Sequence, residues 1–257
     1  MKSVKGYITR KSMLYVTGVE YGDYTMNHVQ GCTHGCLYPC YAYLMKKRFG
    51  QIKTYENWLE PYLVSNTLKL LDREIPRLKD KIKSVQLCFT TDPFMYQYDE
   101  ICQMSIAAIR KLNKSGIKCV ILTKGVLPES LSELSDENEY GITLITLNED
   151  YREKMEPNAA PIKERLASLQ KLHELGKKTW ISMEPYPTPN LIEQDLQQIL
   201  NTAIFADKII FGRTNYCKEV TAYAKHKEFY NEKAKEVIDF CTKHNIEYHI
   251  KDKTITS

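Results

Sequence analysis

The chain has 257 residues, of which 43% are apolar and 26% are charged, enough apolar content and length to bury a sizeable core. No apolar run approaches the roughly 20 residues that span a bilayer, and the N-terminus carries no apolar signal core, so we expect a cytoplasmic protein that no membrane holds. The net charge of +4 permits a polyanionic partner without requiring one.

The N-terminal part of the chain predicts a short β extension followed by a cysteine-bearing loop. Residues 5–24 indicate one or two short strands, and residues 26–29 a first core strand. The next segment, residues 31–43, reads G-C-T-H-G-C-L-Y-P-C-Y-A-Y and runs into a helix predicted over 41–48. Its glycines and proline disfavour a regular helix. We therefore expect a curled loop that turns Cys32, Cys36 and Cys40 towards one point.

Three cysteines in one loop favour thiolate ligation of an inorganic centre. The chain's eight cysteines, in a reducing compartment, are expected to be thiols or ligands rather than disulfides. Thiolate-only sites suit iron–sulfur clusters and zinc, and a site that does chemistry keeps one position open. The count of three predicts a [4Fe–4S] cluster with one iron free for a further ligand. The alternative is a structural Cys₃His zinc site with His34 or His28 as the fourth ligand.

The remainder of the chain alternates between strands and helices. Strands are predicted over residues 85–89, 118–123, 142–147, 179–183, 208–211 and 247–250, and helices over residues 62–79, 101–112, 128–134, 161–175, 191–203 and 228–243. Repeated strand–helix units imply parallel strands with right-handed crossovers.

The number of strands is too small for a closed eight-stranded barrel. The sequence predicts an α/β fold, an open partial TIM barrel of the (β/α)₆ type. We expect one domain, with a β extension over residues 1–25, the core over 26–215 and a C-terminal helix and strand over 216–257.

Polar residues follow five of the predicted strands, where the chemistry of such folds collects. Buried polarity of this kind needs a partner, which a ligand supplies. Helix capping is the alternative, because Thr, Asp and Asn are common caps. The residues concerned are Thr90, Thr91 and Asp92, then Lys124, then Thr146 and Asn148, then Glu184, and finally Arg213.

The cysteine loop also carries a family resemblance. The run from Asn27 to Ala42, N-x-x-x-G-C-x-H-G-C-x-Y-x-C-Y-A, resembles the cluster loop of radical S-adenosylmethionine (SAM) enzymes, in the branch of spore photoproduct lyase. That branch has C-x₃-C-x₂-C, whereas Pro39 lengthens the second spacing here. The T-T-D-P-F run from Thr90, the T-K pair ending at Lys124, and E-P-x₃-P-x₃-R-L from Glu156 are similar to further elements of the branch.

This resemblance implies a radical SAM core, with a [4Fe–4S] cluster on Cys32, Cys36 and Cys40 whose open iron binds SAM. Reductive cleavage then gives methionine and a 5′-deoxyadenosyl radical, which abstracts hydrogen from a substrate. A reducing partner such as flavodoxin or ferredoxin is implied. It also implies cofactor-binding roles for Tyr38, Thr90, Thr91, Asp92, Lys124, Thr146, Asn148, Glu184 and Arg213.

The hydrogen donor and the substrate are less closely defined by the sequence. Cys217 follows a strand end in a loop, and Tyr41 adjoins the cluster, so both are candidate catalytic residues. In spore photoproduct lyase a cysteine directly before the T-S-D element serves as hydrogen donor, whereas Cys88 lies one residue further from Thr90. This difference disfavours repair of thymine photodimers by the lyase mechanism. The first hypothesis is therefore a radical SAM enzyme acting on a nucleic acid or a peptide. The second is a non-catalytic zinc or iron–sulfur module that recognises a nucleic acid.

Overall fold

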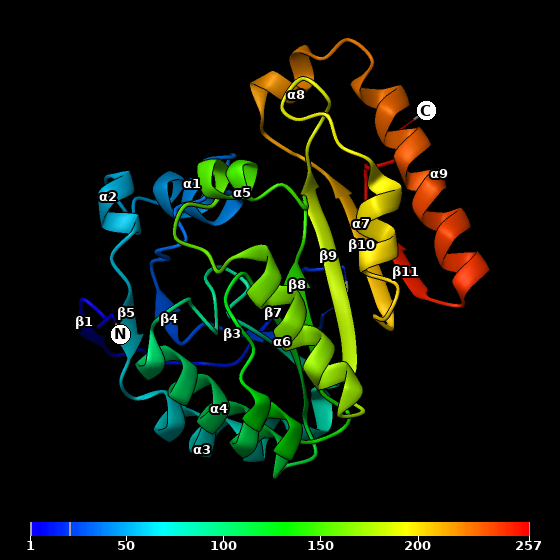
Figure 1. Cartoon of the computed structure of the whole chain (residues 1–257). Coiled ribbons are helices and arrows are strands. Elements are labelled where there is room, and N and C mark those ends of the chain that lie inside the picture. The colour runs from blue at the N-terminus through cyan, green and yellow to red at the C-terminus, as the bar shows by residue number, and fades with distance from the viewer. Residues whose placement is uncertain (1, 21, 257) are drawn as a thin grey trace.

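The computed structural model describes residues 2–20 and 22–256. Within them a curved main sheet has the strand order β11-β10-β9-β8-β7-β6-β3-β2, and every neighbouring pair is parallel except β2 and β3 (Figure 1). Its strands are β2 (Tyr15–Val16), β3 (Tyr24–Met26), β6 (Ser84–Leu87), β7 (Lys118–Thr123), β8 (Glu139–Thr143), β9 (Lys178–Tyr186), β10 (Lys208–Arg213) and β11 (Glu247–Ile250).

A small second sheet joins the N-terminal extension to the cysteine loop. Its order is β1-β5-β4, with the bounds β1 (Gly6–Ile8), β4 (Val29–Gln30) and β5 (Tyr62–Val64). The helices are α1 (Tyr41–Arg48), α2 (Tyr55–Trp58), α3 (Thr67–Leu78), α4 (Asp99–Asn113), α5 (Glu149–Met155), α6 (Ile162–Glu174), α7 (Leu196–Thr202), α8 (Lys218–Ala222) and α9 (His226–His244), with 3₁₀ turns η1 (Lys79–Lys81) and η2 (Glu129–Glu133).

This order is the predicted open partial barrel. Six parallel strands, β3 and β6 to β10, are joined by helical crossovers, and β11 adds a seventh after α9. The sheet leaves β2 and β11 as its edges rather than closing on itself. No helix in the described part of the chain has the length and apolarity to cross a membrane.

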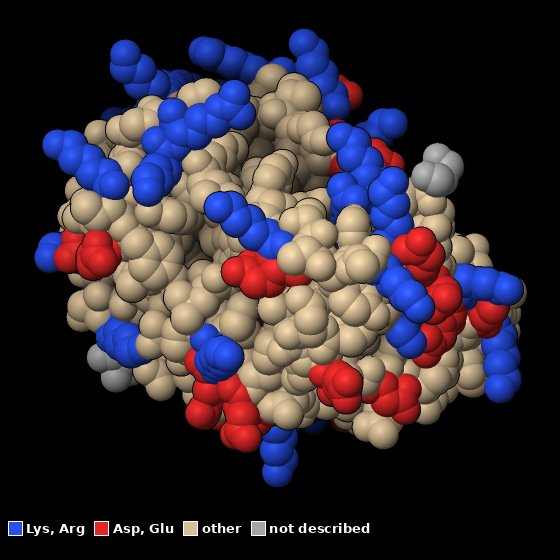
Figure 2. All heavy atoms as spheres, turned by 90° about the horizontal axis from the view of Figure 1, so that it is seen from above, with Lys and Arg blue, Asp and Glu red and all other residues tan. Residues whose placement is uncertain are grey.

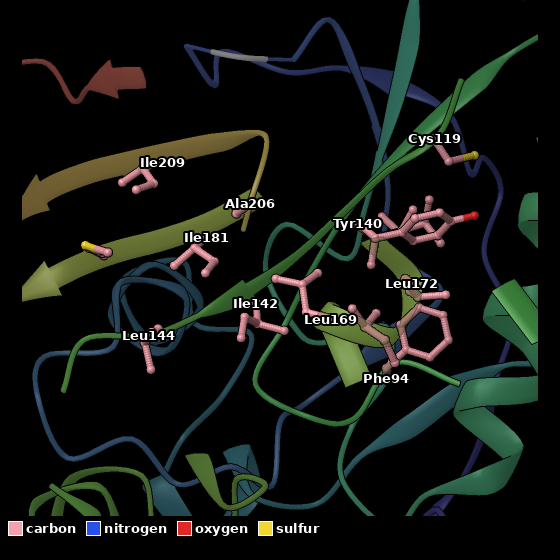
Figure 3. Close-up of a cluster of buried hydrophobic side chains, with 14 of the residues drawn as sticks. Phe94, Cys119, Tyr140, Ile142, Leu144, Leu169, Leu172, Ile181, Ala206 and Ile209 are labelled. Atoms are coloured by element: carbon pink, nitrogen blue, oxygen red, sulfur yellow. The ribbon is translucent and has the colours of Figure 1, made fainter. Parts of the chain in front are cut away.

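The main hydrophobic core lies between the sheet and the helices that cover its outer face. Alternate strand residues such as Ile142, Ile181 and Ile209 meet helix residues such as Leu169 and Leu172 there, all of them fully buried (Figure 3). Alternation along a strand sends the intervening residues to the other face. The inner face therefore receives a different set of side chains.

Inside the barrel, Trp180 fills the space beneath the strand ends. It lies on β9 and forms a small buried cluster with Val120 of β7 and Ile210 of β10. Gly141 of the neighbouring strand β8 allows this, because a Cβ atom built there would come within 2.4 Å of the Trp180 ring. The apolar floor leaves the polar residues above it facing an open space.

Three predicted elements were wrong in position or type. The helix predicted over 62–79 begins with β5, because Tyr62–Val64 pairs with β1 and β4, partners that no local pattern reveals. The strand predicted over 142–147 ends at Thr143, and the apolar residues Leu144 and Ile145 after it are buried in a loop. The strand predicted over 26–29 is divided between β3 and β4, which belong to different sheets.

Two other predicted helices differ less. The helix predicted over 191–203 begins only at Leu196, where Asp195 caps it by accepting a hydrogen bond from Gln197 N. The helix predicted over 128–134 is the 3₁₀ turn η2.

Candidate active site

The cysteine loop runs from β4 to α1 and depends on two glycines. Gly31 has φ +85° and Gly35 has φ +66°, a region that L side chains rarely adopt. A Cβ atom on Gly31 would also lie 2.4 Å from the carbonyl oxygen of Glu60. Glycine at these positions lets the loop turn sharply just before Cys32 and again just before Cys36.

Hydrogen bonds from two other segments fix the loop. Cys32 N donates to Trp58 O at 2.8 Å, and Tyr55 Oη donates to Cys36 O at 3.1 Å, both from the α2 region. Leu37 N donates to Met155 O at 2.8 Å, while the Leu37 side chain is 60% exposed. The extra length of the loop is thus taken up by an outward turn at Leu37, and Cys40 still faces the site.

The three cysteines line a cavity of about 420 Å³ at the carboxyl ends of the strands. That volume is within the range of small-molecule sites. Eleven of the predicted site residues line it, and they come from the loop and from β6, β7, β9 and β10: Cys32, Cys36, Tyr38, Cys40, Tyr41, Thr90, Thr91, Asp92, Lys124, Glu184 and Arg213.

The buried cysteine thiols suit a metal cluster, whose positively charged irons would displace the thiol protons. Burial is the main cause that raises the pKa of Cys32 well above its usual value and that of Cys36 to about 12. Both are therefore neutral thiols until a metal displaces their protons. Across the described residues no three His, Cys, Asp or Glu side chains are grouped to hold a single metal ion. A [4Fe–4S] cluster takes one thiolate per iron and does not require the sulfurs to converge on one atom.

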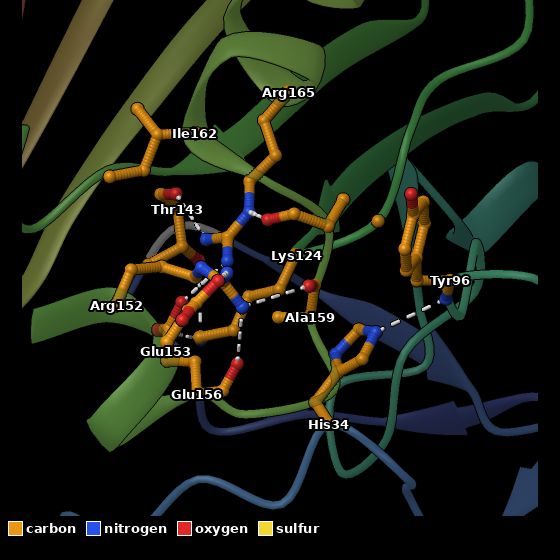
Figure 4. Close-up of polar contacts among 12 residues, drawn as sticks. His34, Tyr96, Lys124, Thr143, Arg152, Glu153, Glu156, Ala159, Ile162 and Arg165 are labelled. Carbon is orange, nitrogen blue, oxygen red and sulfur yellow. Dashed lines mark hydrogen bonds and ion pairs between the residues drawn. The ribbon is translucent and has the colours of Figure 1, made fainter. Parts of the chain in front are cut away.

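Both histidines proposed for a zinc site have their ring nitrogens engaged elsewhere. Tyr96 N donates to His34 Nε2 at 3.2 Å, so Nδ1 carries the proton and faces Asp92 Oδ2 at 3.4 Å (Figure 4). Burial lowers the pKa of His34 to about 4, in keeping with this neutral ring. His28 Nε2 lies 2.8 Å from Ser105 Oγ, and its ring is fully buried.

A buried carboxylate, Glu156, connects the loop to the strand ends (Figure 4). It accepts hydrogen bonds from Tyr38 Oη at 2.6 Å and Arg165 Nη2 at 2.7 Å, and Lys124 Nζ lies 3.9 Å away. Burial alone would raise the pKa of Glu156, but the charges of Arg165 and Lys124 outweigh it and the pKa is lowered. Glu156 and Arg165, which begin and nearly end the E-P-x₃-P-x₃-R-L pattern, therefore form a buried ion pair.

Lys124 presents its ammonium group to the cavity. Burial lowers the pKa of Lys124, yet the Glu156 carboxylate more than offsets this and the pKa is raised, so the side chain stays charged. Its Nζ lies 3.4 Å from Thr143 Oγ1 and 5.8 Å from the centre of the Tyr38 ring. A charged ammonium held at the wall of the cavity can bind a carboxylate.

Asp92 is occupied within the protein. Its Oδ1 accepts from Phe94 N at 2.9 Å and Thr123 Oγ1 at 2.6 Å, and its Oδ2 accepts from Lys124 N at 2.8 Å. These bonds tie the turn after β6 to the end of β7. Asp92 thereby places Lys124, and the prediction that it contacts the cofactor directly remains a prediction.

Three predicted site residues do not line the cavity. Thr146 and Asn148 follow the true end of β8 by several residues. Asn148 caps α5, since its Oδ1 accepts from Tyr151 N at 2.8 Å, and Thr146 Oγ1 accepts from Asn148 N at 3.0 Å in the turn before the helix. The capping alternative thus describes their contacts. Cys217 caps α8 and its Sγ donates to Glu219 Oε2 at 3.2 Å.

The sequence missed several residues that face the cavity. Thr143 and Ser182 lie opposite each other on β8 and β9, and Gln86 on β6 has a buried Oε1 with no partner among the described residues. Alternation would have found them once the strand bounds were right. Glu20 and Lys251 also line the cavity, but they come from opposite ends of the chain and no local pattern joins them.

A loop with three cysteines at the carboxyl ends of the strands of a partial barrel is the arrangement that defines the class of this protein. The family model described as the radical SAM superfamily matches residues 26–203. The chain belongs to the radical SAM superfamily, a class of enzymes, which confirms the resemblance seen in the cysteine loop. An uncharacterised protein, ORF301, of Acidianus two-tailed virus is 29% identical over 192 residues. The match covers 71% of this chain and 62% of the length of the viral protein.

Solved structures show the same fold. Spore photoproduct lyase complexed with a dinucleoside spore photoproduct is similar with a TM-score of 0.65 at 15% identity, over 96% of this chain and 82% of the lyase. A variant of that lyase with bound SAM gives 0.63 at 15% identity, over 96% and 80%. SuiB of Streptococcus suis bound to the precursor peptide SuiA gives 0.51 at 17% identity, over 70% and 41%.

Proposed function

We propose that this chain binds a [4Fe–4S] cluster through Cys32, Cys36 and Cys40 and cleaves SAM reductively to start hydrogen abstraction from a substrate. The observation that carries the proposal is the single cavity shared by these three thiols and the polar ends of β6 to β10. When bound, the cluster and SAM supply the electron transfer and the radical, and a partner such as flavodoxin or ferredoxin supplies the electron.

The residues of the chain bind and orient the cofactor. Lys124 is placed to pair with the carboxylate of SAM, since its charge is retained and its position is fixed by Asp92 and Glu156. The hydroxyl groups of Thr90 and Thr91 face the same space. Thr143 and Ser182 are hydroxyl-bearing residues that line the cavity on β8 and β9, whereas Thr146 and Asn148 do not line it. We assign contacts with the ribose of SAM to Thr143 and Ser182 instead of Thr146 and Asn148.

Tyr41 remains the candidate for hydrogen transfer to or from the substrate. It lines the cavity one residue after Cys40, and its ring lies 5.5 Å from that of Phe89. Burial is the main cause that raises the pKa of Tyr41 to about 12, so the phenol keeps its O–H at neutral pH. Cys217 is less suited to this role because its thiol already donates to Glu219 away from the cavity.

The rim of the cavity favours a nucleic acid as the substrate. Tyr41, Phe89 and Tyr216 line the mouth, and aromatic side chains of this kind stack on bases. Lysine and arginine side chains gather around the hollow on the face seen from above (Figure 2). Basic side chains beside stacking rings suit a phosphate backbone. A peptide is the other class considered, as in the SuiB complex, and the experiment below tells the two apart.

Anaerobic reconstitution with iron and sulfide tests the proposal. The protein should give a reducible [4Fe–4S] signal that changes when SAM is added, and it should release methionine and 5′-deoxyadenosine. Cys36→Ala should lose both, whereas Cys102→Ala, a matched change on α4 away from the cavity, should lose neither. A colourless protein that holds zinc, or a cluster indifferent to SAM, would contradict the proposal. If a set of peptides, but no nucleic acid, raises 5′-deoxyadenosine release, the substrate assignment is wrong.

A further inference from the structure

The cavity wall on the side of β10 contains a cation, Arg213, that forms no ion pair with any residue the structure describes. Lys124, Lys251 and Arg213 are its three lysine and arginine residues. Lys124 has Glu156 at 3.9 Å, and Lys251 has Glu20 at 3.1 Å and Glu184 at 4.0 Å. Arg213 has no carboxylate within 4.0 Å in the part of the chain that the structure describes. Among the described residues, no carboxylate therefore forms an ion pair with Arg213.

Arg213 lines the cavity as the last residue of β10. The pairing of β10 with β9 is irregular at this point: Phe211 pairs with Met183 and Arg213 with Tyr186, so two steps along β10 match three along β9. The extra residue therefore lies in β9, as in a β-bulge, and bulges are frequent beside active sites. Gly212 leaves room for the Glu184 side chain of β9, since a Cβ atom on Gly212 would lie 2.9 Å from it.

One hydrogen bond orients the guanidinium group of Arg213, and its two terminal nitrogens donate to no described residue. Its Nε donates to Asn215 Oδ1 at 2.9 Å, which holds the plane of the group. No hydrogen bond from the two terminal nitrogens reaches any described residue. Two hydrogen bonds of Thr214 fix the segment that follows. Thr214 N donates to Tyr230 Oη at 3.1 Å, and Thr214 Oγ1 donates to Tyr186 O at 2.8 Å. A rigidly held fork with two free N–H edges suits an oxyanion.

Two further features around Arg213 point to a ligand. Tyr216 has φ +59°, in the left-handed region, and its side chain is 76% exposed where it lines the cavity. Glu184 lines the cavity on β9; Lys251 Nζ lies 4.0 Å from its Oε2, beyond hydrogen-bond distance, and no described residue donates a hydrogen bond to its carboxyl group. The wall thus places a guanidinium group with free N–H donors beside a carboxyl group that can accept a hydrogen bond.

We propose that Arg213 binds a phosphate group of the substrate and that Glu184 accepts a hydrogen bond from a hydroxyl or amino group next to that phosphate. A lone carboxylate would satisfy the fork but would bring no donor for Glu184, whereas a nucleotide unit brings both. This inference rests on the proposed function and specifies how that site holds its substrate. It gives Arg213 and Glu184 to the substrate rather than to SAM.

The test measures anion binding to the reconstituted protein in the presence of SAM. Inorganic phosphate and acetate are titrated separately at constant ionic strength, with calorimetry as the readout. Arg213→Gln should weaken phosphate binding about tenfold or more, because charge-assisted hydrogen bonds are lost. Arg213→Lys keeps the positive charge but loses the planar pair of N–H donors, so its phosphate affinity should lie between those of the unaltered protein and Arg213→Gln. Lys218→Gln, which removes an exposed charge that does not line the cavity, is the control and should bind phosphate like the unaltered protein.

Further variants and outcomes keep the inference open to refutation. Asn215→Ala keeps every charge but releases Nε, so it should weaken phosphate binding a few-fold; it serves if Arg213→Gln does not fold. Equal phosphate affinity in Arg213→Gln and the unaltered protein would overturn the inference. So would acetate binding that matches phosphate binding in strength and in its dependence on Arg213. SAM cleavage by the unaltered protein is measured in the same preparation, and its absence would refute the proposed function whatever the anion result.

Discussion

Tyr38 Oη donates a 2.6 Å hydrogen bond to Glu156 Oε1, and this contact joins the cysteine loop to a carboxylate 118 residues further along the chain. Glu156 is 1% exposed and is held in turn by Arg165. Arg165 also donates from Nη1 to Thr143 O, so one network sets the positions of the loop, Lys124 and the end of β8. Tyr38 acts on the site through this network.

Tyr38→Phe should therefore destabilise the protein although it removes a single hydroxyl group. A buried charged acceptor loses a donor, which costs about 1.5–3 kcal/mol. Unfolding in urea measures the loss. Tyr248→Phe, on the exposed strand β11, is the control and should change the free energy of unfolding by less than about 0.5 kcal/mol. Equal effects of the two changes would show that the Tyr38 hydrogen bond contributes nothing.

Local patterns were sufficient for much of the fold. The helix over 41–48 and the strands over 118–123 and 247–250 have the predicted bounds, because their periodicity and end residues lie within the segment itself. The order of strands and helices then gave the open partial barrel. Elements whose partners are distant could not be placed in the same way. Tyr62–Val64 is a strand because β1 and β4 lie beside it, and the apolar pattern there fits a helix equally well.

The site was predictable where one segment holds its residues and obscure where two segments meet. The cysteine spacing placed three thiols at one cavity, and the lengthened spacing at Pro39 did not remove Cys40 from it. By contrast, Glu20 Oε2 lies 2.7 Å from His249 Nε2 across 229 positions of sequence. That contact depends on the curvature of the whole sheet, which brings the loop after β2 to the end of β11. No residue pattern encodes such curvature locally.

Removing one partner of the Glu156–Arg165 pair should lower the free energy of unfolding strongly, and replacing both partners by apolar residues should lower it less than the two single changes together. Glu156→Gln leaves the Arg165 charge buried without its counter-ion, which we expect to cost about 3–5 kcal/mol. The double change Glu156→Leu with Arg165→Met should cost less than the sum of its single changes, since neither charge is then stranded. A double-mutant cycle by urea unfolding gives the coupling energy, and strictly additive single changes would contradict it.

An exposed pair provides the control for that cycle. Lys178 Nζ lies 3.0 Å from Glu137 Oε2, a distance similar to that of the buried pair, but the two side chains are 51% and 69% exposed. Solvent screening should reduce the cost of Lys178→Gln to below about 1 kcal/mol. The comparison separates the effect of burial from that of distance.

Because the ring of His28 is neutral in the folded protein, the protein should become less stable as the pH is lowered. Burial, with a smaller contribution from Arg10, lowers the pKa of His28 to about 3. The unfolded chain titrates near 6.5, so between pH 6.5 and about 3 the unfolded state binds a proton that the folded state does not. Stability is then lost as the pH falls, by about 1.4 kcal/mol per pH unit at most.

Urea unfolding of the unaltered protein and of His28→Gln across this range measures that slope. The variant should show a slope lower by about 1.4 kcal/mol per pH unit, while both proteins should be insensitive to this group at pH 8. The comparison uses slopes, so any constant loss from the hydrogen bond to Ser105 cancels. Identical slopes in the two proteins would mean that the folded state protonates His28 as readily as the unfolded chain does.

The floor of the cavity should tolerate no side chain at Gly141. A Cβ atom there would lie 2.4 Å from the Trp180 ring, which is 2% exposed and held between Val120 and Ile210. Gly141→Ala must therefore shift the ring or the strand, at a cost of about 1–3 kcal/mol in thermal or urea unfolding. Gly18→Ala has no heavy atom within 4 Å of the new Cβ and should be nearly neutral. Since the ring underlies the strand ends that line the cavity, Gly141→Ala should also weaken SAM binding by the reconstituted protein, and unchanged stability would show that the floor is not tightly packed.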